Sequence, residues 1–178
     1  MTGNVLTVGS LMMDVIAYVS RNPRLGETMR GDDLEIVPGG KGFNQAIAAQ
    51  RAGVHSTLVG CMGRDAFGDE FAKFLAKEQV DASGVARSDL VGTGVGLPIV
   101  SKDGQNAIII TVRANDLVDA AFIAGQRERF AGQDMLLLQR VLEAARGRFL
   151  AGGVSFGDAA GATALVWRRR RLDHLRGW

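Results

Sequence analysis

Cysteine is almost absent from this sequence of 178 residues, which contains Cys61 alone. One cysteine cannot form an intramolecular disulfide and cannot supply a cysteine-based metal cluster. Histidine is also scarce, because His55 and His174 are the only two and lie far apart without the spacing of metal ligands. We therefore expect no metal site built from these side chains.

Long hydrophobic runs are absent as well. Long runs such as those at 107–110 and 135–138 have the length of a strand rather than that of a membrane helix. The first residues lead into an apolar strand pattern at 5–8, without the basic start and small-residue cleavage site of a signal peptide. These features predict a cytoplasmic protein with no membrane partner.

Net charge is small, at +2, but it is unevenly distributed. Residues 1–139 are slightly acidic, whereas residues 140–178 form a divergent basic tail that is rich in glycine, alanine and arginine. The tail includes four consecutive arginines at 168–171, which could attract nucleic acid or acidic lipid. Because little aromatic character accompanies them beyond Trp167, we expect an incidental basic tail and no nucleic-acid partner.

Residues 1–139 alternate strand-like and helix-like patterns. Apolar runs predict buried strands at 5–8 and 57–62, with a helix at 41–52 between them that ends before Gly53. Asp65 is positioned to cap a second helix, which continues to Glu78. Further strands are expected at 15–19, 29–37, 83–87 and 135–139, a hairpin at 94–100 and 107–111, and helical structure at 119–130. This alternation predicts an α/β fold with three layers around a parallel sheet.

A glycine cluster within residues 37–46 connects an extended segment to the first helix. Gly39, Gly40 and Gly42 allow backbone N–H groups to approach a ligand, and the positive end of the helix dipole near Lys41 lies at the same place. Two interpretations follow: a site for a polar or anionic small molecule, or a tight turn that binds nothing. A nucleotide P-loop is excluded, because Lys41 precedes a glycine rather than serine or threonine.

The sequence on either side of this cluster resembles the ribokinase-like family of sugar and nucleoside kinases. The family signature has a Gly-Gly pair, an asparagine, a small residue and two later glycines, which here are Gly39-Gly40, Asn44, Ala46, Gly53 and Gly63. The other matching motifs are Gly9-Ser10 followed by Asp14, Gly26-Glu27-Thr28, residues 63–69, and Ala114-Asn115 followed by residues 126–129. The resemblance covers about residues 4–139 and is closest to the ribokinases.

This resemblance implies an incomplete ribokinase-like three-layer sheet with a small β-lid over a sugar site. It also implies ATP-dependent phosphorylation of a sugar hydroxyl, with ATP and magnesium as cofactors, and a homodimer through the lid as in some relatives. The sugar-contacting positions that it implies are Asp14, Gly40, Lys41, Gly42 and Asn44. We expect Asp14 to lie just past the first strand, and its side chain to approach that of Asn44 at the rim of the sheet.

The sequence also departs from the family pattern. Met12 stands where ribokinases have asparagine, Arg113 replaces a glycine, and Val141 replaces an expected glutamate. The family's late Gly-Ala-Gly-Asp motif, with its catalytic aspartate and anion hole, is absent, as is its Asn-and-Glu motif on the ATP and magnesium side. The resemblance therefore assigns no catalytic, cofactor-binding or metal-binding residue to this chain, which we expect to be inactive alone.

Three functional hypotheses remain open. The chain is a carbohydrate kinase, a catalytically inactive truncated or frame-shifted product, or a binding module that uses its basic tail. The arginine-rich and alanine-rich composition of the tail is typical of out-of-frame translation of a GC-rich gene. Residues 162–167 have local helical or extended character, but the tail has no alternating pattern that would add strands beside 135–139. We therefore expect residues after about 145 to be poorly ordered and the sheet edge at 135–139 to be exposed.

Overall fold

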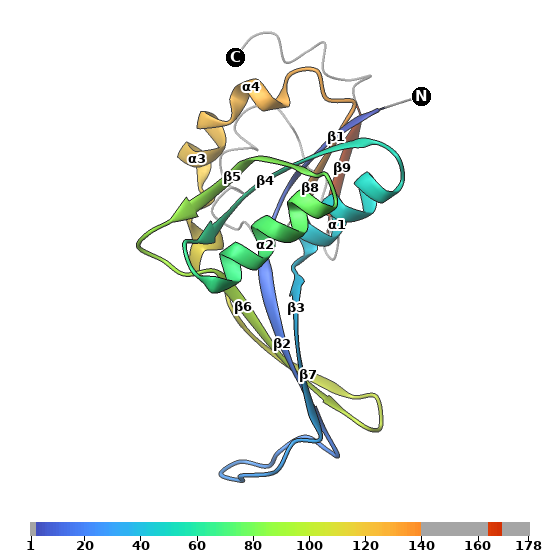
Figure 1. Ribbon diagram of the computed structural model, residues 1–178, viewed down its shortest axis with the longest axis vertical. Coiled ribbons are helices and arrows are strands. Elements are labelled where there is room, and N and C mark those ends of the chain that lie inside the picture. Colours follow the sequence, from blue (N-terminus) through green and yellow to red (C-terminus); the bar gives the residue numbers. More distant parts are fainter. Residues whose placement is uncertain (1–2, 140–163, 169–178) are drawn as a thin grey trace.

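The larger of two β-sheets forms the body of the protein (Figure 1). The computed structural model describes residues 3–139 and 164–168. The strand order of this sheet is β5-β4-β1-β8-β9, formed by Asp81–Ser88, His55–Gly63, Asn4–Val8, Met135–Gln139 and Ala164–Arg168. The first four strands are parallel, and β9 is antiparallel to β8.

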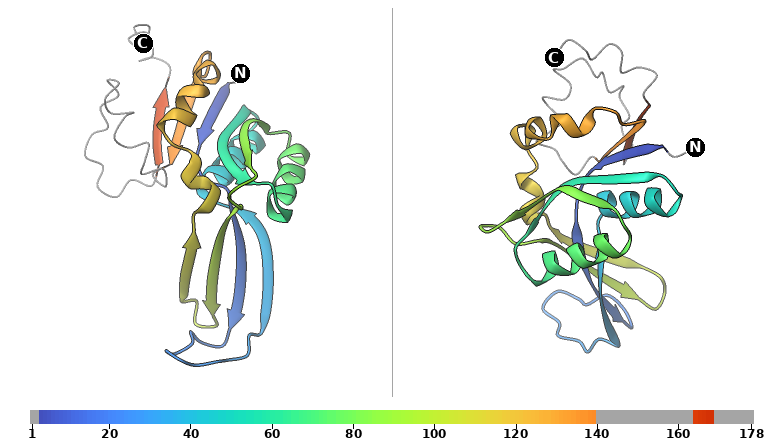
Figure 2. Two further views of the ribbon diagram at one scale, coloured as in Figure 1. Left: turned by 90° about the vertical axis from the view of Figure 1, so that its left-hand side faces the viewer. Right: turned by 45° about the horizontal axis from the view of Figure 1, so that its top comes forward.

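Alternate side chains of the central strands pack into two separate hydrophobic cores, one on each face of the sheet. On β4, Leu58 and Met62 join one core, whereas Val59 and Cys61 join the other, because successive strand residues point to opposite faces. The first core is covered by α1 (Lys41–Arg51) and α2 (Ala66–Lys77). The second is covered by η1 (Arg113–Leu117), α3 (Ala120–Gly125) and α4 (Arg127–Phe130), as Figure 2 shows. The predicted three-layer α/β arrangement is confirmed.

The helix boundaries follow the predicted capping signals. The Asp65 side chain accepts a hydrogen bond from the Gly68 N–H at the start of α2. The first helix ends at Arg51, one residue earlier than predicted, and Gly53 follows with a φ of 84°, which suits glycine at a helix end. Local sequence therefore marks the start of α2 and the end of α1.

The smaller sheet is the predicted lid, and it projects away from the body (Figure 1). Its strand order is β3-β2-β6-β7, formed by Asp33–Gly39, Met12–Val19, Gly94–Ser101 and Asn106–Thr111. The β6-β7 hairpin turns at Gly104, which has a φ of 81°, and β6 runs parallel to β2. The sequence predicted this hairpin but not its membership of the lid.

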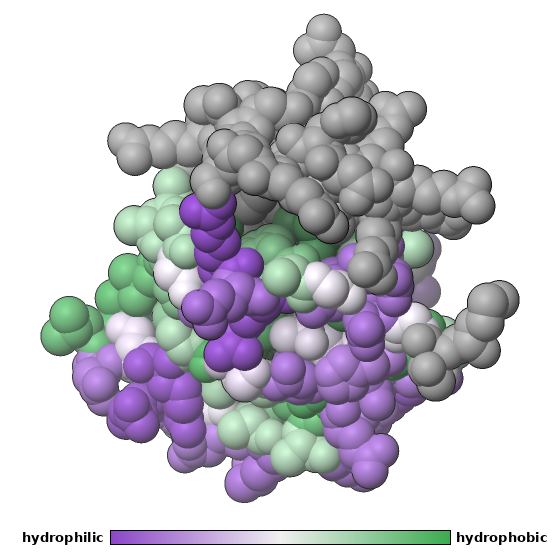
Figure 3. Space-filling view, turned by 90° about the horizontal axis from the view of Figure 1, so that it is seen from above, coloured by the Kyte–Doolittle hydropathy of each residue, from purple (hydrophilic) through white to green (hydrophobic). Residues whose placement is uncertain are grey.

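The surface differs between the lid and the top of the body. The lid exposes large apolar side chains on three strands: Leu34, Ile36, Leu97, Ile108, Ile109 and Ile110. The view from above in Figure 3 instead shows hydrophilic residues around smaller apolar patches on the described surface. Within residues 3–139 and 164–168, no helix is both long and apolar enough to cross a membrane.

The basic tail contributes a strand to the main sheet. β9 pairs with β8 from Gln139 opposite Ala164 to Met135 opposite Arg168. The prediction that the tail adds no strand beside 135–139 is therefore wrong. The poor order expected after about residue 145 is also wrong for 164–168, and the strand edge at 135–139 that was expected to be exposed is paired. Backbone pairing with an open edge does not require alternating side chains, which explains the error. Residues 140–163 and 169–178, with Val141 and most of the arginine run, lie outside the described residues.

Candidate functional site

Asp14 lies at the base of the lid, as the third residue of β2. It pairs with Val37 of β3 on one side and with Gly96 of β6 on the other. A Cβ atom added to Gly96 or to Gly39 would collide with the Asp14 carboxylate oxygens. These two glycines therefore leave space for the carboxylate over one face of the lid. The next strand was expected to begin at residue 15, but β2 already begins at Met12 because it pairs there with both β3 and β6, so Asp14 lies within it.

The Asp14 carboxylate is partly buried and has no partner among the described residues. Among the residues that the structure describes, none donates a hydrogen bond to it or forms an ion pair with it. Burial raises the pKa of Asp14 above its ordinary value, because desolvation disfavours the charged form. Such a carboxylate has its acceptor capacity available for the hydroxyl groups of a ligand.

The glycine turn between β3 and α1 borders this carboxylate. Gly40 has a φ of 98°, and a Cβ atom there would lie 2.6 Å from the backbone oxygen of Ser10, so both conformation and space require glycine. Lys41 and Asn44 follow in the first turn of α1, with exposed side chains. Since Gly39 neighbours the Asp14 carboxylate, the turn brings the start of α1 to the same part of the molecule.

Gly42 has a packing reason to be glycine. A Cβ atom at this position would lie 2.5 Å from both the Cα and the carbonyl carbon of Gly9, and 2.7 Å from the nitrogen of Ser10. The Phe43 N–H donates to the Ser10 carbonyl oxygen at 3.1 Å, which fixes α1 against this connection. The Cα of Gly42 thus packs directly against the protein's own backbone. No pattern in the sequence indicated this contact.

The side chain of Asn115 fixes the connection between β1 and β2 through hydrogen bonds to the backbone of Leu11. This side chain is almost fully buried, and its Oδ1 accepts from the Leu11 N–H at 2.9 Å. Its Nδ2 donates to the Leu11 carbonyl at 2.8 Å and to the Val112 carbonyl at 3.0 Å. Because Leu11 precedes β2 directly, Asn115 fixes the strand that carries Asp14. The Ala-Asn motif marked this residue, but the sequence could not reveal a contact 104 residues away.

The order of these motifs along the chain is that of a known family. Residues 2–150 match the pfkB family of carbohydrate kinases. The chain belongs to this family.

Relatives of this pfkB chain include ribokinases. The ribokinase of Schizosaccharomyces pombe is 34% identical over 142 residues, which are 76% of this chain and 45% of the relative. A ribokinase structure from Cryptococcus neoformans, in complex with ADP, aligns with a TM-score of 0.73 and 28% identity, covering 86% of this chain and 48% of that one. The ribokinase of Thermotoga maritima also gives a TM-score of 0.73, with 29% identity over 83% of this chain and 48% of that one. This chain therefore spans about half the length of the curated relatives that it matches.

Membership of the pfkB family confirms the predicted fold, and the sugar contacts stay a prediction. The structure places Asp14 beside the turn that contains Gly40, and Lys41, Gly42 and Asn44 follow within the first turn of α1. Only Asp14 among these five has an unpartnered carboxylate at the base of the lid. The expected approach of the Asn44 side chain to Asp14 remains a prediction.

Arg113, where the sequence departs from the pfkB pattern, occupies a position suited to glycine. Its φ of 50° lies in the left-handed region, which explains why a glycine fits here. The arginine compensates through its side chain, since Nη1 donates to the Thr93 carbonyl at 3.1 Å and the guanidinium packs on Gly92. Arginine at this position therefore strains the backbone but forms a contact with the segment that leads into β6.

Asp65 joins the start of α2 to the same segment. Its carboxylate accepts from the Thr93 hydroxyl at 2.6 Å and from the Thr93 N–H at 2.8 Å, while that hydroxyl accepts from the Gly63 N–H at 3.0 Å. Burial acts to raise the pKa of Asp65, but the hydrogen bonds from Thr93 and Gly68 and the charge of Arg113 outweigh it and hold the pKa below its ordinary value. Asp65 therefore acts as a structural anion at the base of β6.

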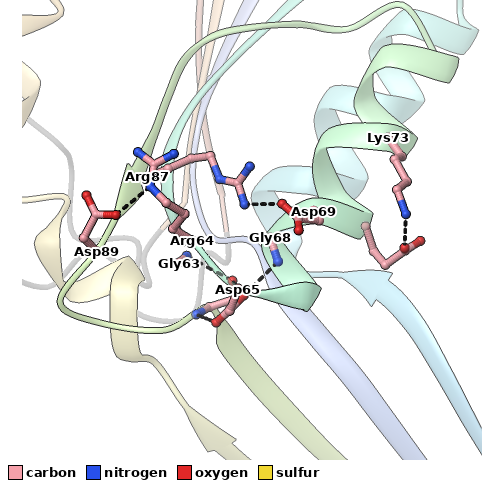
Figure 4. Close-up of polar contacts among 10 residues, drawn as sticks. Gly63, Arg64, Asp65, Gly68, Asp69, Lys73, Arg87 and Asp89 are labelled. Atoms are coloured by element: carbon pink, nitrogen blue, oxygen red, sulfur yellow. Dashed lines mark hydrogen bonds and ion pairs between the residues drawn. The ribbon is translucent and has the colours of Figure 1, made fainter.

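Two ion pairs near the protein surface lie around Asp65, as Figure 4 shows. Arg64 contacts Asp89 at 2.6 Å, and Arg87 contacts Asp69 at 2.5 Å. Exposed pairs of this kind contribute little to stability because water and salt screen them. The contacts of Asp65, Arg64 and Asp69 within the motif at 63–69 thus serve the fold.

The magnesium that the resemblance implied finds no cluster of three or more protein ligands among the described residues. In the part of the chain that the structure describes, no group of three or more histidine, cysteine, aspartate or glutamate side chains could hold a metal ion. The Gly-Ala-Gly-Asp motif, with which the resemblance associates the catalytic aspartate and the anion hole, does not occur in the sequence. We therefore derive no chemical step through ATP or magnesium from these residues.

Proposed function

We propose that this chain provides the sugar-binding half of a ribokinase-type carbohydrate kinase and binds a small sugar at the base of its lid. The observation that carries the proposal is the partly buried Asp14 carboxylate, which has no partner in the described part of the chain and lies beside Gly39 and Gly96. A carboxylate can accept hydrogen bonds from two neighbouring hydroxyls at once, and this geometry suits a sugar. Each such charge-assisted bond contributes about 1.5 to 3 kcal/mol.

The other proposed contacts come from the turn into α1. Gly40 and Gly42 contribute backbone groups of the turn, Lys41 adds an exposed cation, and the Asn44 amide offers both a donor and an acceptor. Backbone N–H groups at the start of a helix also favour oxygen-rich ligands. These residues supplement Asp14, which supplies the only carboxylate in the group.

The proposed reaction of the whole kinase is transfer of the γ-phosphate of ATP, with magnesium, to a sugar hydroxyl. Support comes from membership of the pfkB family and from the likeness to ribokinases. This chain spans about half of those relatives and lacks the Gly-Ala-Gly-Asp motif. We therefore favour a second proposal for the isolated chain, that it is a catalytically inactive product that retains sugar binding.

A homodimer through the lid is the proposed assembly. Six large apolar side chains are exposed on the lid strands, from Leu34 on β3 to Ile110 on β7. An exposed apolar sheet of this kind commonly marks a protein–protein contact. Sedimentation analysis of wild type and of Ile109→Lys tests the assembly, and a wild-type monomer at high concentration would exclude it.

The decisive experiment combines binding with turnover. Isothermal titration with pentoses, hexoses and nucleosides should find a sugar that binds wild type, and Asp14→Ala should weaken it at least tenfold. Glu35→Gln is the matched control, because Glu35 is an exposed lid carboxylate already hydrogen-bonded by the Tyr18 hydroxyl at 2.9 Å. With ATP and magnesium added, the isolated chain should transfer no phosphate. Phosphoryl transfer at ordinary enzyme rates would refute the proposed inactivity, and failure to bind any sugar would refute the proposed site.

A further inference from the structure

The two ends of the β6-β7 hairpin meet where the lid joins the body of the protein. Thr93 immediately precedes β6, and Arg113 follows the end of β7 by two residues. The Arg113 Nη1 donates to the Thr93 carbonyl oxygen at 3.1 Å, and the Ala114 N–H donates to the Gly92 carbonyl oxygen at 3.0 Å. One side chain and one backbone hydrogen bond therefore close the base of this hairpin.

Thr93 connects the base of the hairpin to the body. It is fully buried, and both its hydroxyl and its N–H donate to the Asp65 carboxylate at the start of α2. The same hydroxyl accepts from the Gly63 N–H at the end of β4. Since the Thr93 carbonyl accepts from Arg113, the guanidinium is linked through this one threonine to a helix and a strand of the body.

η1 holds the starts of two lid strands through its side chains. Asn115 bonds to the backbone of Leu11 before β2, and Arg113 bonds to Thr93 before β6. The third connection, from β3 into α1, passes through Gly39 and Gly40, which have no side chains. The orientation of the lid on the β6 side therefore depends on the side chain of Arg113.

The backbone of Arg113 is unfavourable for a residue with a side chain. Its φ of 50° lies in the left-handed region, where a Cβ atom is strained. Such strain persists only where surrounding contacts determine the conformation, and it is a reason to look for a role. Here the guanidinium fills the space that a side chain at Gly92 would need, and it reaches the Thr93 carbonyl from there.

We infer that Arg113 is a latch, which holds the lid in a fixed orientation by joining the base of the β6-β7 hairpin to Thr93 and, through Thr93, to Asp65 on the body. The lid opens at this base only when the hydrogen bond between Arg113 and Thr93 breaks. Because β6 also carries Gly96 beside Asp14, the latch fixes the strand that borders the candidate site. The inference concerns the attachment of the lid and does not depend on sugar binding.

Amide hydrogen exchange of the full chain, measured residue by residue by NMR, tests the latch. The reporters are the N–H groups of Thr93 and Ala114 at the hairpin base, and the reference is the N–H of Leu6 in the fully buried part of β1. Arg113→Gly removes the latch but relieves the backbone, so the variant should fold. The ratio of the reporters' protection factors to that of Leu6 should fall about tenfold, because a hydrogen bond from a charged group is lost from the closed form alone.

Arg64→Ala is the matched control. Arg64 is also an arginine next to Asp65, but its side chain pairs with Asp89, so the ratio should stay at the wild-type value. An unchanged ratio in Arg113→Gly would overturn the inference, including the case in which Leu6 loses protection by the same factor as the reporters. An equal fall in Arg64→Ala would also overturn it, because any loss of positive charge near Asp65 would then have the same effect.

Discussion

Asn115→Ala tests whether one buried amide fixes the strand that carries Asp14. The change removes the acceptor of the Leu11 N–H and the donor to the Leu11 and Val112 carbonyls. A buried N–H without a partner costs about 1 to 3 kcal/mol, and the carbonyls and the small cavity add to that. We expect a loss of about 3 to 5 kcal/mol, which is a large part of the stability of an ordinary domain.

Urea unfolding followed by circular dichroism measures this loss. With a typical slope of about 2 kcal/mol per molar urea, the midpoint should fall by about 2 M. Asn106→Ala is the control, because Asn106 is exposed on β7 and its replacement should change stability by less than about 0.5 kcal/mol. Asn115→Asp should be at least as harmful at neutral pH, since it places a carboxylate against two carbonyl oxygens. A loss below about 1 kcal/mol for Asn115→Ala, or a tolerated Asn115→Asp, would refute the reasoning.

Three further predictions concern the supports of the site. Gly42→Ala should destabilise the protein by about 2 kcal/mol or more, because its Cβ would meet backbone at 2.5 Å, whereas Gly125→Ala, with open space around it, should be neutral or stabilising in the same melts. Asp65→Ala should cost about 2 kcal/mol at neutral pH. Since the pKa of Asp65 is lowered on folding, its contribution is present above the ordinary pKa and is lost as pH falls through the folded value, so melts of variant and wild type should converge in acid. Arg113→Gly should be about 1 kcal/mol more stable than Arg113→Ala in urea unfolding, because only glycine relieves the left-handed backbone, and equal stabilities would contradict this.

Secondary structure could be predicted well where local signals determine it. The apolar run at 57–62 predicted β4, and Asp65 marked the start of α2. The start of β2 was predicted too late, because Asp14 interrupts an apolar run and pairing on both sides maintains the strand. The strand β9 was missed because the open edge of β8 determines it, and its own residues give no alternating pattern.

The candidate site could be predicted only as a set of residues. Motif order identified Asp14 and the glycine turn, but no pattern in the sequence states that Gly39 and Gly96 clear space for the carboxylate. The role of Asn115 depends on contacts across 104 residues, and a sequence without its fold cannot supply them. Gly42 was attributed to ligand approach, whereas its close contact is with Gly9.

The pKa of Asp14 tests directly whether its carboxylate binds the hydroxyls of a sugar, which is the central claim. Carbon-detected NMR titration of the full chain should first find that pKa above its ordinary value, as burial requires. A saturating sugar should then lower it, because hydroxyls that donate to the carboxylate favour the charged form. An Asp14 pKa that is unchanged by every sugar that binds the protein would contradict the central claim.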